Sequence, residues 1–297
     1  MSEWSRREFI AAVAAIGAAA PRALGAAAPP SRIKPGYSAI TWGGKDDQAI
    51  DDIASVGFKG IQLRATVLEK YGTQPAALRR RLTNRGLTFV VFSSGNLKFD
   101  PAAAQEQLAL HTAHAAFVRD AGGAFIQVID EKPRDRATSP DDYARLGQLL
   151  SELGRRTAAA GVPLVYHHHM NSLGQPPDAI EAILRASDPA AVSLLLDIAH
   201  YQQGGGDPVA AIRKYRDRIR IVHLKDVRAT AGAPGYEWVE LGRGRVDVKG
   251  CVSALREIGF RGWAIVELDR VPEPSGSPKA SADMNRDYVV GELGLTL

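Results

Sequence analysis

The sequence contains a single cysteine, Cys251, among its 297 residues. One thiol cannot form an internal disulfide bond, and it cannot supply the several thiolates of a cysteine zinc cage. A disulfide framework and a thiolate metal site are therefore both excluded. Any metal bound to this chain has to be held by histidines and carboxylates, and five of the seven histidines lie between residues 167 and 223.

The chain also lacks a strong excess of charge and a long hydrophobic run. Lys and Arg together number 37 against 33 Asp and Glu, a net charge of +4, and no dense basic tract is present. Nucleic acid is therefore not the expected partner. The apolar run over residues 10–20 is about half of the ~20 residues that span a bilayer, so we expect no stable membrane span.

The N-terminal segment has the features of an export signal. Arg6 and Arg7 precede the apolar run, and the small residues Ala26, Ala27 and Ala28 follow it. This arrangement resembles a bacterial twin-arginine signal peptide. It predicts a signal over residues 1–28, cleavage after Ala28, and a mature protein in the periplasm.

The rest of the chain alternates between strand-like and helix-like segments. The near-continuous apolar runs are typical of strands buried on both faces of a parallel sheet. They lie at 37–42, 61–65, 87–93, 125–130, 163–167, 192–197, 219–224 and 263–268. Eight such units without an internal linker favour an α/β fold, a single (β/α)₈ TIM barrel over residues 36–297.

Ionisable residues gather where the predicted strands end. The carboxyl ends of barrel strands meet at one face, and that face carries the active site. Asp197, His223 and Glu267 end three consecutive apolar strands. Buried charges at such positions are costly unless they are paired or bind a metal. Imidazole and carboxylate ligands without thiolate suit Mn²⁺, Mg²⁺, Co²⁺ or Zn²⁺, so we predict that these three residues bind a divalent metal.

Two residues, each at the end of a predicted strand, are candidates for the fourth metal ligand. In the triplet His167-His168-His169, alternation along a strand puts the first and third side chains on one face and His168 on the other. We predict His167 as a metal ligand, His169 near the substrate and His168 in a structural role. Glu131 competes for the ligand position, although it is adjacent to Asp130 and only one of the two faces the barrel mouth.

Four segments together resemble the xylose isomerase-like TIM-barrel superfamily, the sugar phosphate isomerase/epimerase family. They are Leu196-Asp197-Ile198-Ala199-His200, Val222-His223-Leu224-Lys225-Asp226, the segment 241–247 and Gly262-Trp263-Ala264-Ile265-Val266-Glu267. The resemblance covers roughly residues 36–297. It implies a divalent ion on Asp197, His223 and Glu267, and chemistry through a metal-stabilised enediolate of a keto sugar or polyol.

Two features separate this chain from the epimerases of that family. Those enzymes place a glutamate near the end of the fifth strand, where this sequence has His167. The segment Tyr166-His167-His168-His169-Met170 is most similar to inosose dehydratases, which eliminate water next to a ketone. We expect this enzyme to be an isomerase or epimerase, with a dehydratase or lyase as the alternative.

The remaining candidate residues follow from this chemistry. Glu131, His169 or His200 would serve as the base, and Lys225 would bind an oxyanion or act as an acid. Arg64 and Arg243 are candidates for substrate binding, Arg243 because it lies in a Gly-x-Gly segment after the seventh strand, where barrels often bind anions. Trp42 either stacks on the substrate or packs in the core.

Two rival functions have features that would reveal them. A DNA-repair endonuclease of the same fold needs a further histidine before the Gly-x-Gly segment, where this chain has Trp238-Val239-Glu240. A non-catalytic periplasmic sugar-binding barrel would hold no metal. The partner that we expect is a small sugar or polyol, and self-association into a homodimer stays open.

Overall fold

The computed structural model describes residues 32–133, 136–274 and 276–297. The predicted signal peptide, residues 1–28, lies outside this part of the chain. Within the described residues, no helix combines the length and the apolar character needed to cross a membrane.

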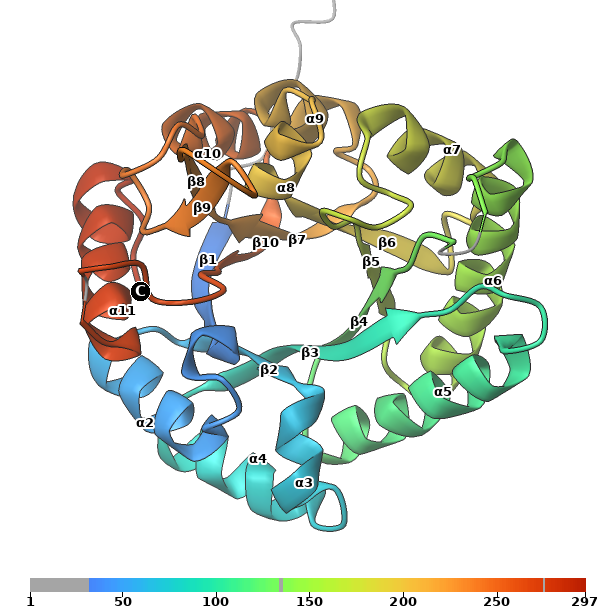
Figure 1. Cartoon of the computed structure of the whole chain (residues 1–297). Helices are drawn as coiled ribbons and strands as arrows, with labels where there is room; N and C mark the ends of the chain where they lie inside the picture. The colour runs from blue at the N-terminus through green and yellow to red at the C-terminus, as the bar shows by residue number, and fades with distance from the viewer. Residues whose placement is uncertain (1–31, 134–135, 275) are drawn as a thin grey trace, which may run out of the picture.

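Eight parallel strands close into a barrel, as the sequence predicts (Figure 1). Around the barrel the order is β1-β10-β7-β6-β5-β4-β3-β2, so neighbours in the chain are neighbours in the sheet apart from the interposed β8 and β9. The barrel strands are β1 (Arg32–Ser38), β2 (Gly60–Arg64), β3 (Thr88–Leu97), β4 (Phe125–Asp130), β5 (Leu164–His167), β6 (Val192–Asp197), β7 (Ile219–Leu224) and β10 (Arg261–Val266).

Helices surround the barrel on the outside (Figure 1). They are α2 (Asp46–Val56), α3 (Leu68–Tyr71), α4 (Pro75–Asn84), α5 (Ala104–Asp120), α6 (Pro140–Ala159), α7 (Pro177–Ala186), α8 (Ile198–Gln203), α9 (Pro208–Lys214), α10 (Val248–Glu257) and α11 (Pro278–Asp287). Several begin where a side chain binds the free backbone N–H groups of the first turn. Asp207, for example, accepts hydrogen bonds from the amides of Val209 and Ala210 at the start of α9.

The first strand lies earlier than the sequence predicts. We expect a strand at 37–42, but β1 ends at Ser38 and the turn η1 (Ala39–Trp42) follows. Pro35 and Gly36 have low strand propensity, yet pairing with β10 from Arg32 to Tyr37 fixes the extended backbone. Gly36 lies against the Gly60 backbone and the Ile265 side chain, where a Cβ atom would clash.

The structure contains a short hairpin after β7 that the sequence analysis does not predict. Strands β8 (Asp226–Ala229) and β9 (Tyr236–Val239) pair antiparallel outside the barrel. Asp226, the first residue of β8, accepts hydrogen bonds from the amides of Gly242 at 3.0 Å, Gly244 at 2.9 Å and Val246 at 3.0 Å. The Gly-x-Gly segment therefore folds around a carboxylate of the protein itself, and a Cβ atom at Gly244 would collide with Asp226.

The barrel interior changes from apolar to polar toward the carboxyl ends of the strands. Five buried side chains, Val91, Val165, Leu195, Ile221 and Ile265, belong to one apolar cluster. Residues i and i+2 of a strand share a face, so the side chains two positions further along also point inward. We call eight polar residues at this level, one for each strand, the polar ring: Ser38, Gln62, Ser93, Gln127, His167, Asp197, His223 and Glu267.

Candidate metal centre and active site

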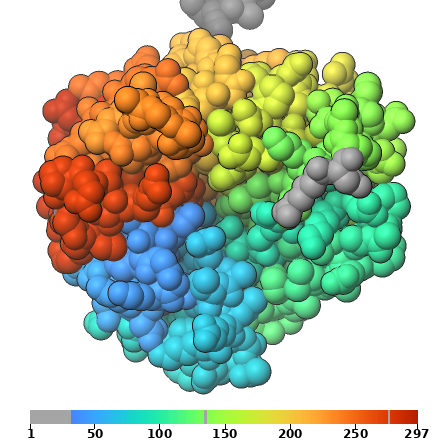
Figure 2. Space-filling model, in the orientation of Figure 1, coloured from blue at the N-terminus to red at the C-terminus, as the bar shows by residue number. Residues whose placement is uncertain are grey.

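A cavity of about 600 Å³ opens at the carboxyl ends of the strands. It coincides with the hollow near the centre of the space-filling view (Figure 2). The lining residues include Gln62, Gln127, His167, His169 and Glu267. This volume lies within the range of roughly 300–1,000 Å³ that is common for small-molecule sites.

The structure brings together the four residues predicted as metal ligands. His167, Asp197, His223 and Glu267 each offer one ligand atom, and these four atoms all lie within 4.8 Å of one another. The four side chains come from β5, β6, β7 and the end of β10, which are consecutive around the barrel. All four are buried, with exposed fractions of 5% or less.

Gln62 fixes the tautomer of His223. Its Oε1 atom lies 2.8 Å from His223 Nε2, while its Nε2 atom donates to Glu267 Oε2 at 3.1 Å. An amide oxygen only accepts, so His223 Nε2 must carry the ring proton that it donates. His223 Nδ1 then has a free lone pair, and it is a buried atom without a hydrogen-bond partner. A second partner that orients a histidine in this way is common at metal sites.

One carboxylate oxygen of Asp197 has no hydrogen-bond partner and lies near His223 Nδ1. Its Oδ1 atom accepts from the amides of Ala199 and His200 and so begins helix α8. Its Oδ2 atom is buried without a hydrogen-bond partner and lies 3.4 Å from His223 Nδ1. Burial alone would raise the pKa of Asp197, but the nearby Lys225 ammonium and His223 lower it to about 2. The carboxyl group is therefore ionised at neutral pH.

Lys225 provides the buried cation of the site. Its ammonium group donates to Glu267 Oε1 at 3.2 Å and to Asp269 Oδ1 at 2.6 Å. Burial would lower the pKa of Lys225, but the Asp269 and Glu267 carboxylates outweigh it and raise the pKa above its usual value. Lys225 therefore stays charged, and its contacts show it holding these two acids rather than lining the cavity.

The charges and the unpaired atoms both fit a divalent cation. The Lys225 ammonium contacts the carboxylates of Glu267 and Asp269 and is influenced electrostatically by that of Asp197, so three negative charges and one positive charge leave a net charge of two minus. Buried carboxylates without compensation are costly. His223 Nδ1 and Asp197 Oδ2 each lack a hydrogen-bond partner at this place. One divalent ion would balance the charge and give both atoms a partner.

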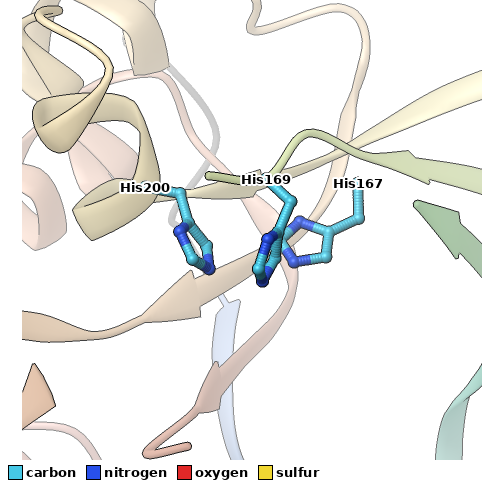
Figure 3. Close-up of side chains that lie close together, drawn as sticks. All are labelled: His167, His169 and His200. Carbon is cyan, nitrogen blue, oxygen red and sulfur yellow. The ribbon is translucent and has the colours of Figure 1, made fainter. Parts of the chain in front are cut away.

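A second group of three histidines lies beside these four residues. Ligand atoms of His167, His169 and His200 also lie within 4.8 Å of one another, and Figure 3 shows the three rings converging. This group contains no carboxylate, and the Lys225 ammonium lies 3.3 Å from His200 Nε2. A second divalent ion there would add charge beside a buried cation, so the four-residue group is the better place for the metal.

His169 has the geometry of a base. Its Nδ1 atom lies 2.8 Å from the carbonyl oxygen of Met170, which only accepts, so Nδ1 carries the proton and Nε2 has the lone pair. His169 lines the cavity, and its ring lies 3.9 Å from that of His200, centroid to centroid. His200 is 1% exposed. Burial and the Lys225 charge hold the pKa of His200 well below its usual value, so it stays neutral.

His168 points away from the other two histidines of the triplet. It is completely buried, and its Nε2 atom accepts a hydrogen bond from the Asp197 amide at 3.2 Å. Its ring also contacts that of Tyr201 edge to face. These contacts connect β5 to β6 and fit the structural role that strand alternation predicts.

Asp130 and Glu131 take different positions at the end of β4. Asp130 is 2% exposed and accepts hydrogen bonds from Tyr166 Oη at 2.6 Å, Ser172 Oγ at 3.2 Å and the Gly174 amide at 3.0 Å. It thereby fixes the loop that follows β5. Glu131 lines the cavity and accepts from Asn96 Nδ2 at 2.9 Å. Glu131 does not belong to the four-residue group, which contains His167.

The three candidates for substrate binding separate in the structure. Arg64 lines the cavity. Trp42 is 4% exposed and donates from its indole N–H to Asp52 at 2.8 Å, which favours the core alternative. Arg243 lies on the segment that Asp226 holds, and its side chain is 52% exposed. Neither Trp42 nor Arg243 is among the described residues that line the cavity.

Sequence reasoning missed two glutamines of the site. Gln62 and Gln127 line the cavity and are each 2% exposed. A signal was available, because each glutamine stands alone inside an otherwise apolar strand, Ile61-Gln62-Leu63 and Ile126-Gln127-Val128. A polar residue buried in a strand needs a partner.

Comparisons with known proteins agree with the fold. The model of the xylose isomerase-like TIM barrel family matches residues 50–288. Inosose dehydratase of Lacticaseibacillus casei is 31% identical over 255 residues, 76% of this chain and 83% of that protein.

Two solved structures share the fold at lower identity. IOLI protein with a bound zinc atom has a TM-score of 0.74 at 18% identity, covering 88% of this chain and 98% of that one. L-ribulose 3-epimerase also has a TM-score of 0.74, at 20% identity, covering 89% and 95% of the two chains. By its family match and its inosose dehydratase relative, this chain belongs to the xylose isomerase-like TIM barrel family.

Proposed function

We propose that this protein is a divalent-metal-dependent dehydratase that removes water from a cyclic keto-polyol or keto sugar. The observation that carries the proposal is the pair of buried, unpaired atoms, His223 Nδ1 and Asp197 Oδ2, 3.4 Å apart. They lie within one ligand group with His167 and Glu267. The named relative that is 31% identical is an inosose dehydratase, and it supports elimination over the isomerase label that the sequence favours.

The chain supplies a place for the ion and a place for the substrate. His167, Asp197, His223 and Glu267 would hold the ion, and the cavity begins at two of them, His167 and Glu267. A divalent ion bound there supplies Lewis acidity to a carbonyl oxygen and so makes the neighbouring C–H group more acidic.

His169 is the base in this proposal. Its Nε2 atom has the lone pair, since Nδ1 donates to the Met170 carbonyl, and the residue lines the cavity. It takes the proton from the carbon next to the carbonyl group. The C–O bond to the hydroxyl group on the following carbon then breaks, and His169 gives its proton to the departing hydroxide, which leaves as water.

A single base of this kind fits elimination better than epimerisation. An epimerase of the two-glutamate type needs a base on each face of the substrate. Here β5 carries His167 in place of the glutamate, and His167 is part of the ligand group. Burial and the neighbouring His223 lower the pKa of His167 well below its usual value, so it suits a neutral metal ligand.

The reaction can be tested directly by the mass of the product. The purified protein is incubated with an inosose and, separately, with 3-keto-glucose, each with and without added Mn²⁺. We expect a metal-dependent product that has lost one water, and we expect no product from His223→Ala. The His114→Ala variant, altered on helix α5 outside the cavity, is the matched control.

Each outcome of this assay decides between functions. A product of unchanged mass would identify an isomerase or epimerase. Binding without any product would identify a sugar-binding barrel. Full activity of His223→Ala would refute the metal centre.

A further inference from the structure

The polar ring divides into two halves of different chemistry. The ionisable half consists of His167 on β5, Asp197 on β6, His223 on β7 and Glu267, the residue directly after β10. The other four strands carry only hydroxyl and amide side chains, Ser38, Gln62, Ser93 and Gln127. In the barrel order, β4 lies across from β10 and β3 lies across from β7. Gln127 and Ser93 therefore lie across the barrel mouth from Glu267 and His223, while β4 pairs directly with β5, the strand of His167.

The two glutamines of the polar ring, Gln62 and Gln127, differ in their hydrogen bonds. Gln62 uses both ends of its amide, toward His223 and toward Glu267. Gln127 has one long contact, from Nε2 to Ser93 Oγ at 3.5 Å, while its Oε1 atom is buried without a hydrogen-bond partner. Turning the amide over would exchange the two ends, and one end would still be unpaired.

An unpaired amide oxygen in a buried position is costly for the protein alone. Removing such a group from water without a replacement partner is unfavourable. Gln127 is 2% exposed, yet it lines the cavity together with Ser93. The Gln127 side chain therefore borders the space that a ligand would occupy.

The chemistry of this wall defines the group that it would bind. An amide oxygen beside a serine hydroxyl offers both an acceptor and a donor and carries no charge. That combination matches a sugar or polyol hydroxyl group, which both donates and accepts. Three charged residues, Arg64, Glu131 and Lys132, also line the cavity, and Arg64 is the register partner of Ser93 on β2.

We propose that Gln127 and Ser93 form a hydroxyl-binding subsite that recognises the side of the substrate ring farthest from the carbonyl group. The inference rests on the proposed function, because that function places the carbonyl at the four-residue ligand group. It makes Gln127 a residue that determines specificity: the preferred substrate is a neutral ring with a hydroxyl group across from its ketone.

The test compares binding of two ring ketones by titration calorimetry with the metal-loaded protein. One probe is scyllo-inosose, and the other is its analogue that lacks the hydroxyl group across from the carbonyl. We expect wild-type protein to bind the first probe roughly 5- to 10-fold more tightly, as for one neutral hydrogen bond. The Gln127→Leu variant should bind both probes equally, at the weaker affinity.

A second readout separates recognition from structure. Because Gln127→Leu removes an unpaired buried acceptor, its melting temperature without ligand should equal or exceed that of the wild type. A lower melting temperature, with both probes weakened equally, would show a structural role and overturn the inference. Undiminished discrimination by Gln127→Leu would overturn it as well.

These outcomes also separate the inference from the proposed function. Wild-type protein that binds neither probe would refute the polyol substrate and this subsite together. Wild-type protein that binds both probes with one affinity would refute the subsite and leave the proposed function in place.

Discussion

The Gln62→Leu substitution should weaken metal binding without touching any metal ligand. Gln62 accepts a hydrogen bond from His223 Nε2 at 2.8 Å and donates one to Glu267 at 3.1 Å. Leucine keeps a similar size but offers neither contact. The His223 ring then loses the partner that fixes its tautomer, and Glu267 loses a donor that orients its carboxylate.

The expected loss follows from these two contacts. Outer partners of metal ligands typically contribute 10- to 100-fold in metal affinity, which corresponds to about 1.4–2.8 kcal/mol. Two hydrogen bonds, one of them to a carboxylate, have a combined value of about 2–4 kcal/mol. We therefore expect the dissociation constant for Mn²⁺ or Zn²⁺ to rise by roughly 30-fold.

The assay is competition between the protein and a fluorescent chelator of known affinity. Gln127→Leu is the matched control, since it makes the same substitution in the same ring but contacts neither His223 nor Glu267 in the described structure. Its metal affinity should stay within about twofold of the wild type. Equal affinities of Gln62→Leu and wild type, or an equal loss in the control, would refute the reasoning. If Gln62→Leu fails to fold, Gln62→Met keeps the length of the side chain, offers neither hydrogen bond, and should also weaken metal binding.

Further predictions concern the base, the loop after β5, a buried histidine and export. His169→Gln should lower kcat by about 10²- to 10⁴-fold while metal content stays that of the wild type, and loss of the metal would contradict this role. Asp130→Ala removes the acceptor for two hydroxyl groups and one amide; we expect urea denaturation to show a loss of about 3 kcal/mol in the free energy of unfolding, and an unchanged midpoint would be contrary evidence. Burial lowers the pKa of His111 to about 4, so between about pH 6.5 and pH 4 the unfolded chain binds a proton that the folded chain does not, and stability falls with falling pH by up to about 3 kcal/mol. In His111→Gln the free energy of unfolding should depend less on pH over this range. Parallel pH profiles for the variant and the wild type would contradict the prediction. Replacing Arg6 and Arg7 by lysine should leave the protein in the cytoplasmic fraction, whereas unchanged export would reject the twin-arginine signal.

The strand ends were the most informative part of the sequence. His167, Asp197 and His223 each stand two residues after a buried apolar side chain that packs inside the barrel. The alternation of a strand then forces the polar side chain to the same interior face. Barrel closure brings strands together that lie far apart in the chain, so the fold turns a local pattern into a cluster. The role of these residues as ligands stays a prediction.

Features that depend on contacts between different elements could not be predicted from the sequence. Asp226 is one more acid after a strand, and only the folded chain shows its carboxylate inside the Gly242–Gly244 turn. Trp42 comes soon after β1, where a residue of the barrel mouth is expected. Its indole N–H instead donates a hydrogen bond to Asp52 on α2. In both cases a partner elsewhere in the chain decides which way the side chain points.

The most direct test of the central claim is the position of the metal in a crystal soaked with Zn²⁺ or Mn²⁺. An anomalous difference map should show one peak about 2.0–2.3 Å from His223 Nδ1, with the ligand atoms of His167, Asp197 and Glu267 around it. A peak between His167, His169 and His200, or no peak at either group, would contradict the account.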